Sequence, residues 1–507
     1  MTWETLANLA SERLGAVAVW ASDDFFAAKE NLLRDGAPEW REHEYTDRGK
    51  WMDGWESRRK RTAPGADAYD EVIVRLAMPG VVRGVVVDTA FFRGNFPETC
   101  MIEGTTAPEG TLADDLRSRV EWIELVPRAA LRGDDKNVFL PKSRVAFTHL
   151  RVRIFPDGGV ARLRVHADPI AGFPRTGSAA DTLDLAALEN GGEVVSCSDM
   201  FFGPKHNLIQ PGRARNMSDG WETKRRRGIT NETHDWALVK LAGQGTLSRL
   251  EIDTAFFLGN FPDTALVEGC NGDPEASRLR SDQKDGFHEV LGRTKLMGHT
   301  RHVFQAELGA RGPFTHLRLK VFPDGGVSRL RAFGRLTVLG RDDAAARRLS
   351  TSSPSDAGSH LRACCGSKHF IETMARERPF DDGGAALMAR ARAITSSLAE
   401  VDLLEAMAAH PRIGDAGPAT RNEPSAAEQA RVQSGSPEVL TALAEQNRAY
   451  EAKHGFVFLI CATGKTADEV LAAARARLQH PRATELEVAA RELAEITVLR
   501  LRKLVGD

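Results

Sequence analysis

The sequence predicts a multidomain protein in which two mainly-β, jelly-roll-like β-sandwich repeats precede an all-α helical domain. Three observations lead to this prediction. The chain has 507 residues, which is room for about three domains of 100–200 residues each. Several sequence blocks recur once in its first two thirds, and the residue pattern then becomes helical. The expected parts are repeat 1 at 1–175, repeat 2 at 176–340, a linker at 341–356 and the helical domain at 357–507.

The duplication is visible as three blocks that return at offsets of 166, 165 and 167 residues. The longest pair is identical at 13 of 17 positions. The pairs are 53–61 with 219–227, 88–97 with 253–262, and 148–164 with 315–331. A fainter pair, Ser22-Asp-Asp-Phe-Phe26 and Ser198-Asp-Met-Phe-Phe202, opens the copies. This period is the size of a whole domain and too long for a solenoid unit, so it predicts two duplicated domains.

Short apolar runs between turn signals predict β-structure in both copies. Residues 71–77 and 236–242 have strand-like patterns. The alternating run Arg151–Phe155 meets Pro156-Asp-Gly-Gly159, a strong turn signal. Many short strands joined by Gly, Pro and Asp turns are typical of a sandwich or jelly roll.

Beyond a Ser- and Asp-rich stretch read as the linker, four segments lack Pro and Gly and carry helix formers: 402–409, 438–454, 467–478 and 485–505. The last has an apolar stripe formed by Leu486, Ala490, Leu493, Ile496 and Leu504. Arg500 falls on the same face as this stripe. A guanidinium there either forms a structural ion pair, or reaches solvent over a snorkelling stem, or clamps an anion.

Composition excludes several classes of protein. A net charge of −2 and a pI near 6.7 argue against a nucleic-acid partner. No apolar run reaches the length of a membrane helix, and the first ten residues do not resemble a signal peptide. Six cysteines without a CxxC pair indicate neither a disulfide framework nor a structural zinc site. We therefore expect a cytoplasmic protein.

The helical region contains three motifs that could carry chemistry. His410 extends the stripe of Leu403 and Met407 and precedes a helix-ending proline, so it can titrate near neutral pH, although a structural histidine is the more frequent case. The stretch 425–428 matches a capping box. Gly464-Lys465-Thr466 is not a phosphate loop, because the motif requires Gly where Leu459 stands.

Residues 357–507 carry six motifs in order: Cys364-Cys-Gly-Ser, Met374 to Phe380, Ala409-His-Pro-Arg-Ile-Gly414, Ser425-x-x-Glu428-Gln429, Gly455-Phe-Val-Phe-Leu-Ile-Cys461 and Glu485 to Leu501. Together these motifs resemble 2-oxo-4-hydroxy-4-carboxy-5-ureidoimidazoline (OHCU) decarboxylase, the urate-pathway enzyme that produces (S)-allantoin. The resemblance implies an all-α, usually dimeric fold without a cofactor. One departure is Phe370, where the family commonly has Trp.

This resemblance also implies residue roles. His410 is the general acid/base, and Glu428 and Arg500 are its catalytic partners. The implied substrate-binding residues are Pro411, Ser425, Gln429, Phe458, Leu459, Ile460, Cys461 and Ala462. The residue types suit the reaction, because loss of CO2 leaves electron density on a ring carbon that must receive a proton on one face.

In the repeats, Asp53-Gly-Trp-Glu56 followed by a basic run is either a solvated turn or a site, and its return in repeat 2 favours a site. Asp88 and Asp253 are either strand-edge turn formers or site carboxylates, with equal weight. His149 and His316 are more readily core-edge histidines than ligands. No cluster has convincing metal-ligand spacing.

Both copies resemble the allantoicase repeat over residues 10–338, on the Asp-Gly-Trp-Glu, Asp-Thr-Ala-Phe-Phe-x-Gly-Asn-Phe-Pro and Phe-Pro-Asp-Gly-Gly blocks. The resemblance implies hydrolysis of allantoate to ureidoglycolate and urea. That reaction needs an acid, a base and a cation for the substrate carboxylate. The candidates are Lys29, Asn31, Asp53, Glu56, Arg58, Asp88, Asn95 and Glu103, with Lys205, Asn207, Asp219, Glu222, Asp253, Asn260 and Glu268 in repeat 2.

The copies differ at Asn137 against His302 and at Glu30 against His206. Either one site is degenerate, or one composite site draws on both repeats. The sequence thus predicts a bifunctional enzyme of urate breakdown with small-molecule substrates, a homo-oligomeric state and an open metal dependence in its allantoicase part. The alternative is a tandem jelly-roll ligand-binding module attached to a decarboxylase.

Overall fold

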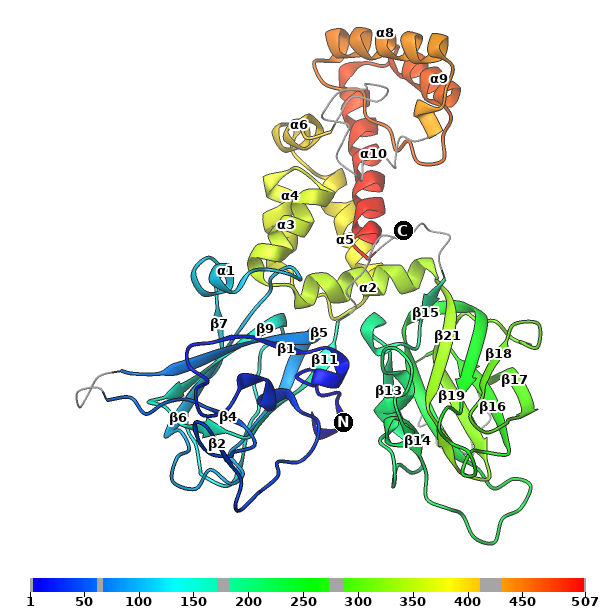
Figure 1. Cartoon of the computed structure of the whole chain (residues 1–507). Helices are drawn as coiled ribbons and strands as arrows, with labels where there is room; N and C mark the ends of the chain where they lie inside the picture. The colour runs from blue at the N-terminus through cyan, green and yellow to red at the C-terminus, as the bar shows by residue number, and fades with distance from the viewer. Residues whose placement is uncertain (1–2, 62–66, 171–181, 273–285, 411–430, 506–507) are drawn as a thin grey trace. The chain divides into compact units, whose positions relative to one another are not determined.

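The computed structural model describes residues 3–61, 67–170, 182–272, 286–410 and 431–505. They form two compact units, and the boundary between the units lies between Thr337 and Val338 in the sequence. The first unit contains both β-repeats and the second is helical (Figure 1). This division confirms the predicted fold class of two β-sandwich repeats followed by a helical region.

Repeat 1 is organised around one strand of 19 residues, β5. Its first half pairs with β1 and β9 and its second half with β11 and β8, and the register shifts between Arg75 and Gly80. One long strand therefore contributes to both halves of the sandwich. The strands are β1 Val17–Ala21, β2 Tyr45–Thr46, β3 Gly49–Lys50, β4 Trp55–Glu56, β5 Asp70–Asp88, β6 Thr99–Thr105, β7 Ile123–Ala130, β8 Lys136–Phe139, β9 Ala146–Phe155, β10 Gly159–Val160 and β11 Arg162–Pro169.

Repeat 2 repeats this plan around β15, with the register shift between Lys240 and Gly245. β13 and β19 pair with the first half of β15, and β21 and β18 pair with the second. The strands are β12 Leu183–Asp184, β13 Glu193–Cys197, β14 Trp221–Glu222, β15 Asp235–Asp253, β16 Thr264–Cys270, β17 His288–Lys295, β18 Arg301–Phe304, β19 Phe314–Phe322, β20 Gly326–Val327 and β21 Arg329–Leu336.

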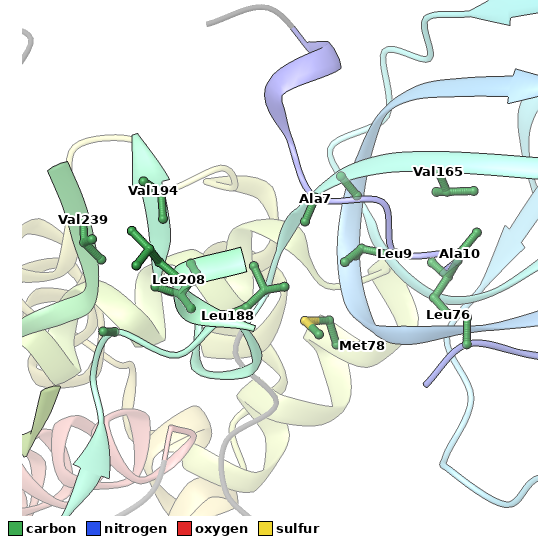
Figure 2. Close-up of a cluster of buried hydrophobic side chains, with 14 of the residues drawn as sticks. Ala7, Leu9, Ala10, Leu76, Met78, Val165, Leu188, Val194, Leu208 and Val239 are labelled. Carbon is green, nitrogen blue, oxygen red and sulfur yellow. The ribbon is translucent and has the colours of Figure 1, made fainter. Parts of the chain in front are cut away.

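Short helices complete the β unit. They are η1 Trp3–Thr5, η2 Glu12–Leu14, η3 Lys29–Leu33, α1 Ala113–Ser118, η4 Leu188–Asn190, η5 Lys205–Ile209 and η6 Met217–Asp219. One buried apolar cluster runs through both repeats. Figure 2 shows Ala7, Leu9 and Met78 of repeat 1 in this cluster with Leu188 and Leu208 of repeat 2. The two repeats therefore share apolar burial, which stabilises their association.

Two glycines allow the repeated motifs to pack closely around a buried phenylalanine. A Cβ on Gly159 would lie 1.9 Å from the ring of Phe92, and one on Gly326 would lie 2.0 Å from the ring of Phe257. Both rings are fully buried. The Phe-Pro-Asp-Gly-Gly block thus needs its last glycine because a side chain there would overlap the ring.

The helical unit is built around α10, which packs against α5, α3 and α2. Its helices are α2 Val338–Thr351, α3 Pro354–Cys364, α4 Lys368–Arg376, α5 Gly384–Ser396, α6 Glu400–Ala408, α8 Pro437–His454, α9 Ala467–Arg477 and α10 Arg482–Lys503. The four helices expected from the sequence are α6, α8, α9 and α10. Thr466 forms a capping box with Glu469 at the start of α9, which accounts for the Gly-Lys-Thr motif without a phosphate.

The structure corrects the prediction of a linker at 341–356, because this segment is helical. It lies within α2 and the first turn of α3. Ala345, Ala346 and Leu349 are buried, and Asp342 forms an ion pair with Arg502 of α10 at 2.6 Å. The helical unit therefore begins at Val338 rather than at 357. In the described part of the chain, no helix is both long and apolar enough to cross a bilayer.

We expect Gly159→Ala to lower the free energy of unfolding of the β unit by about 1–3 kcal/mol, because the added methyl group overpacks the Phe92 contact. Gly94→Ala is the matched control, since a Cβ there meets nothing within 4 Å. Calorimetric melting of the full chain measures both variants. Equal melting temperatures for the two would contradict the packing role of Gly159.

Candidate active sites

In each repeat, the repeated motifs meet at a carboxylate–amide pair. Glu56 ends β4, which pairs with β10 of the Phe-Pro-Asp-Gly-Gly block. Asn95 Nδ2, from the Gly-Asn-Phe-Pro block, donates to Glu56 Oε1 at 2.7 Å. In repeat 2, Asn260 Nδ2 donates to Glu222 Oε1 at 2.6 Å. The structure thus brings together these four predicted candidates, pair by pair.

The surroundings of Glu56 favour its protonated form. Burial raises the pKa of the Glu56 carboxyl above its ordinary value, and Asp157 acts in the same direction. The hydrogen bond from Asn95 and the charge of Arg59 oppose this shift without cancelling it. A carboxyl with a raised pKa can serve as a general acid near neutral pH.

Asp53 and Asp219 anchor the loop that carries each glutamate. Asp53 accepts from Arg162 at 2.5 Å, and both residues are almost fully buried. Asp219 lies 3.4 Å from the equivalent Arg329. Asn31 and Asn207 hold the same loops by donating to the carbonyls of Gly54 and Gly220, each at 2.9 Å. These candidates are placed to position the loops rather than to contact a substrate.

Other candidates also have structural partners. Asp88 and Asp253 each accept the backbone N–H two residues ahead at 2.9 Å, which favours the turn-forming alternative. Glu103 and Glu268 pair across strands with Arg151 at 2.8 Å and Arg318 at 2.6 Å.

The basic candidates pair with groups other than Glu56 and Glu222 in the described residues. Arg58 binds Asp23 at 2.6 Å, with its side chain 64% exposed. Lys29 binds Glu30 at 2.7 Å, whereas buried Lys205 donates to the carbonyls of Val194 and Val195. The two lysines therefore have different environments.

The differences between the copies have structural explanations. Asn137 accepts from Arg132 N and donates to Val87 O. His302 accepts from Met297 N and donates to Ile252 O, which are the equivalent backbone groups. His149, in a Thr-His-Leu context shared with His316, is buried beside Arg75, and its pKa falls to about 4. The core-edge interpretation of this histidine fits that environment.

His206 and Glu30, at corresponding positions of the two repeats, have different surroundings. Burial lowers the pKa of His206 to about 4, and Thr5 and His166 of repeat 1 contribute to its environment. Glu30 lies at the surface beside Lys29. Over residues 3–61, 67–170, 182–272, 286–410 and 431–505, no group of three or more His, Cys, Asp or Glu side chains is arranged to hold a metal.

In the helical unit, His410 lies directly after α6 and is buried, at 8% exposure. Its Nδ1 is 2.9 Å from the carbonyl of Ala406. Since a carbonyl only accepts, this contact assigns the proton to Nδ1 and makes Nε2 the nitrogen for proton exchange. Pro411, Ser425, Glu428 and Gln429 lie outside the described residues.

Arg500 lies on α10 and is half-buried. Its charge acts on the buried Cys365 thiol, whose pKa burial raises and Arg500 lowers in part. The apolar stripe predicted for this helix is buried at Ala490, Leu493 and Ile496. The role of Arg500 as a partner of His410 stays a prediction.

The segment Phe458–Ala462 joins α8 to α9 and is held through its backbone. Leu459 O accepts from Arg477 Nη1 at 2.8 Å. Cys461 N donates to Glu492 Oε2 at 2.8 Å, and Cys461 O accepts from Lys465 Nζ at 2.7 Å. Phe458, Leu459, Ile460 and Ala462 are buried. The predicted substrate-binding backbone is therefore held at Leu459 and at Cys461.

A buried network fixes Arg477 in turn. Glu485, which is fully buried, accepts from Arg477 Nε and Nη2, both at 3.0 Å. It also accepts from the Tyr450 hydroxyl and lies 2.6 Å from His480 Nδ1. Sequence reasoning missed Arg477, Glu485, Arg162 and Arg329 as residues that position the sites. Arg477 follows Val470 and Ala474 on the buried face of α9, a signal that does not identify its partner. Arg162 and Arg329 share a strand face with Arg164 and Arg331, so strand alternation gave no such signal.

Together, these features define a two-part enzyme: a duplicated β-sandwich with a carboxylate–amide pair in each copy, and a helical domain with a buried histidine. The allantoicase repeat model matches residues 7–170 and 183–337, and the OHCU decarboxylase model matches 350–502. The chain therefore belongs to the allantoicase family and carries an OHCU decarboxylase domain after it. It is a bifunctional hydrolase and decarboxylase of urate breakdown.

Named relatives agree with this assignment. The chain is 46% identical over 331 residues to probable allantoicase 1 of Burkholderia mallei, covering 65% of this chain and 94% of the relative. It is 42% identical over 334 residues to a probable allantoicase of Photobacterium profundum, covering 66% and 98%. The crystal structure of allantoicase from Saccharomyces cerevisiae has a TM-score of 0.52 and 32% identity, covering 65% of this chain and 92% of that one.

We expect Arg477→Lys to raise KM for decarboxylation about tenfold, equivalent to about 1.4 kcal/mol of binding. A lysine cannot bind Glu485 and the Leu459 carbonyl in one planar arrangement, so the substrate-holding backbone loosens. Arg475→Lys, on the exposed face of the same helix, is the control. Steady-state kinetics with far-UV circular dichroism measures both variants, and an unchanged KM in folded Arg477→Lys would exclude this role.

Proposed function

We propose that the β unit hydrolyses allantoate to ureidoglycolate and urea at the Glu56–Asn95 and Glu222–Asn260 pairs. The supporting observation is that the repeated motifs build the same carboxylate–amide contact twice, at 2.7 and 2.6 Å. Each pair uses residues from separate sequence blocks that fold against one another. The rival binding-module interpretation does not account for membership of an enzyme family along the whole β unit.

In the proposed reaction, water adds to the central carbon of allantoate as the bond from that carbon to one ureido nitrogen breaks. Protonated Glu56 donates its proton to this nitrogen, which leaves as urea, and the carboxylate then takes a proton from the added water. Burial raises the pKa of this carboxyl, so the acid form persists closer to neutral pH. Asn95 orients the carboxyl through its hydrogen bond. Arg59, whose charge acts on Glu56, is the candidate that binds the substrate carboxylate. Glu222, which accepts from Asn260 at 2.6 Å, is the corresponding candidate acid in repeat 2.

We also propose that His410 delivers the proton that replaces CO2 in the helical domain. The Ala406 carbonyl holds Nδ1 at 2.9 Å, which fixes the ring, so that the proton is delivered from Nε2. Proton delivery from one fixed side gives a single stereoisomer of allantoin. Glu428 would tune the imidazole, and Arg500 would stabilise developing negative charge.

The OHCU decarboxylase family acts without a cofactor. A homo-oligomer and a cytoplasmic location stay predictions. Allantoin, the product of one activity, becomes the substrate of the other after its ring is hydrolysed. We therefore place this chain on both sides of a ring-opening step that another protein performs.

We expect the single variants Glu56→Gln and Glu222→Gln each to retain urea release from the other repeat, because each substitution removes one general acid. The double variant should lose about 100-fold or more of the urea-release rate. Glu98→Gln, at an exposed position next to the Gly-Asn-Phe-Pro block, is the control. In Glu222→Gln, the rate should fall as pH rises through the raised pKa of Glu56. Complete loss in each single variant would instead indicate one composite site.

We expect His410→Asn to reduce (S)-allantoin formation by about 10²–10⁴-fold, the usual contribution of a positioned acid. Chiral detection of allantoin measures the activity, and far-UV circular dichroism checks the fold. His369→Asn, at an exposed position on α4, is the control and should leave the rate of (S)-allantoin formation unchanged. Normal stereospecific turnover by folded His410→Asn would end this assignment.

A further inference from the structure

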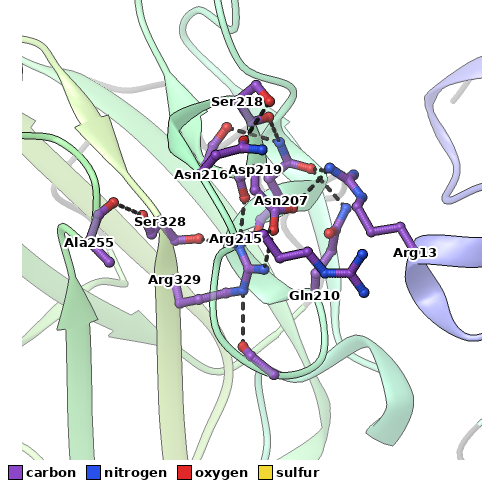
Figure 3. A network of polar contacts seen from close by, with 12 residues as sticks. Arg13, Asn207, Gln210, Arg215, Asn216, Ser218, Asp219, Ala255, Ser328 and Arg329 are labelled. Atoms are coloured by element: carbon purple, nitrogen blue, oxygen red, sulfur yellow. Dashed lines mark hydrogen bonds and ion pairs between the residues drawn. The ribbon is translucent and has the colours of Figure 1, made fainter. Parts of the chain in front are cut away.

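The anchoring aspartates of the two repeats have different second cations. In repeat 1, Asp53 Oδ1 lies 3.2 Å from Arg34 Nη1 of the same repeat. In repeat 2, Asp219 Oδ1 lies 2.9 Å from Arg13 Nη1, which belongs to repeat 1 (Figure 3). The equivalent loop in repeat 2 is therefore held by a residue of the other repeat.

Alignment of the copies explains this exchange. Lys29-Glu-Asn-Leu-Leu-Arg34 corresponds to Lys205-His-Asn-Leu-Ile-Gln210, so repeat 2 has an uncharged residue where repeat 1 has Arg34. Gln210 Nε2 donates to Asn207 Oδ1 at 2.8 Å. In the opposite amide orientation, its oxygen accepts from Arg13 at 3.0 Å and its nitrogen donates to Asp219 at 3.3 Å. A glutamine at this position thus makes room for the guanidinium of Arg13 and binds it.

The exchange is not reciprocal. At the same offset, Arg13 of repeat 1 corresponds to Glu189 of repeat 2. A carboxylate cannot replace a guanidinium as the partner of Asp53, which already has Arg34 and Arg162. Repeat 1 therefore holds its loop with its own residues, whereas repeat 2 depends on repeat 1.

Arg13 contacts both groups that hold the repeat 2 loop. Besides Asp219, its Nη2 donates to Asn207 Oδ1 at 3.3 Å, and Asn207 Nδ2 donates to Gly220 O at 2.9 Å. Asp219 is buried, at 3% exposure, and the Arg13 side chain is 28% exposed. Loss of Arg13 leaves the buried Asp219 carboxylate paired with Arg329, 3.4 Å away, and removes the shorter of these two contacts.

We propose that Arg13 is a positioning residue, supplied by repeat 1, for the Glu222–Asn260 site of repeat 2. It acts through Asp219 and Asn207, which fix the loop that ends at Glu222. Arg34 has the same role for Glu56 within repeat 1. This inference depends on the proposed function, because it requires Glu222 to act in hydrolysis.

The test isolates each site in the full chain. Glu56→Gln leaves only the repeat 2 site, and Glu222→Gln leaves only the repeat 1 site. We expect Arg13→Gln to reduce kcat at least tenfold in the Glu56→Gln background and less than twofold in the Glu222→Gln background. Arg34→Gln should give the reverse pattern. Arg83→Gln, which removes an exposed ion pair with Asp168, is the control and should affect neither background.

Hydrogen exchange gives a readout that does not depend on the glutamates. Arg13→Gln should increase exchange in residues 213–222 of repeat 2 and leave 38–56 unchanged, and Arg13→Lys should restore part of the protection. Equal loss in both backgrounds, unchanged exchange in 213–222, or an inactive Glu56→Gln enzyme would each overturn the proposal. Full activity of both glutamate variants would instead refute the proposed catalytic acids, while the exchange result would still decide whether Arg13 holds the loop.

Discussion

The architecture of the β unit depends on a buried arginine–aspartate pair in each repeat. A guanidinium cannot lose its proton, so inside a protein it requires an anion and hydrogen-bond acceptors. Arg162 is 2% exposed and binds both the carboxylate and the carbonyl of Asp53. Arg329 does the same with Asp219. Because each pair ties the last long strand to the loop that carries Glu56 or Glu222, the polar core determines where the acid lies.

Much of the fold could be predicted from the sequence because periodicity reports burial directly. The alternating run at 151–155 lies in β9, and the segments without Pro and Gly are helices. The linker prediction failed because it weighed the Ser- and Asp-rich composition of 341–356 above the helix-start signals within it. Ser353 accepts from Asp356 N at 3.1 Å, and Pro354 opens α3. Both are ordinary helix-start signals within a Ser-rich stretch.

The candidate site was less predictable, since duplication preserves structural and catalytic residues alike. Asp53, Asp88, Glu103 and Glu56 all recur in repeat 2. Only their partners separate them: an arginine for Asp53 and Glu103, a turn N–H for Asp88 and an amide for Glu56. These partners are remote in sequence, so spacing could not reveal them. Pairwise differences were equally misleading, because Asn137 and His302 bind equivalent backbone groups.

The divergence of the copies is concentrated in the segment before the Asp-Gly-Trp-Glu loop. Residues 35–52 of repeat 1 correspond to the shorter 211–218 of repeat 2. The longer segment carries β2 and β3, and its Trp40 packs on Phe91 with ring centroids 5.7 Å apart. In repeat 2, the equivalent Phe256 instead meets His299 at 5.4 Å. Repeat 1 thus supports its Asp-Gly-Trp-Glu loop with its own residues. Repeat 2 has a shorter segment and Gln210 in place of Arg34, and its Asp219 binds Arg13 of repeat 1. Duplicated domains that began alike can in this way become dependent in one direction only.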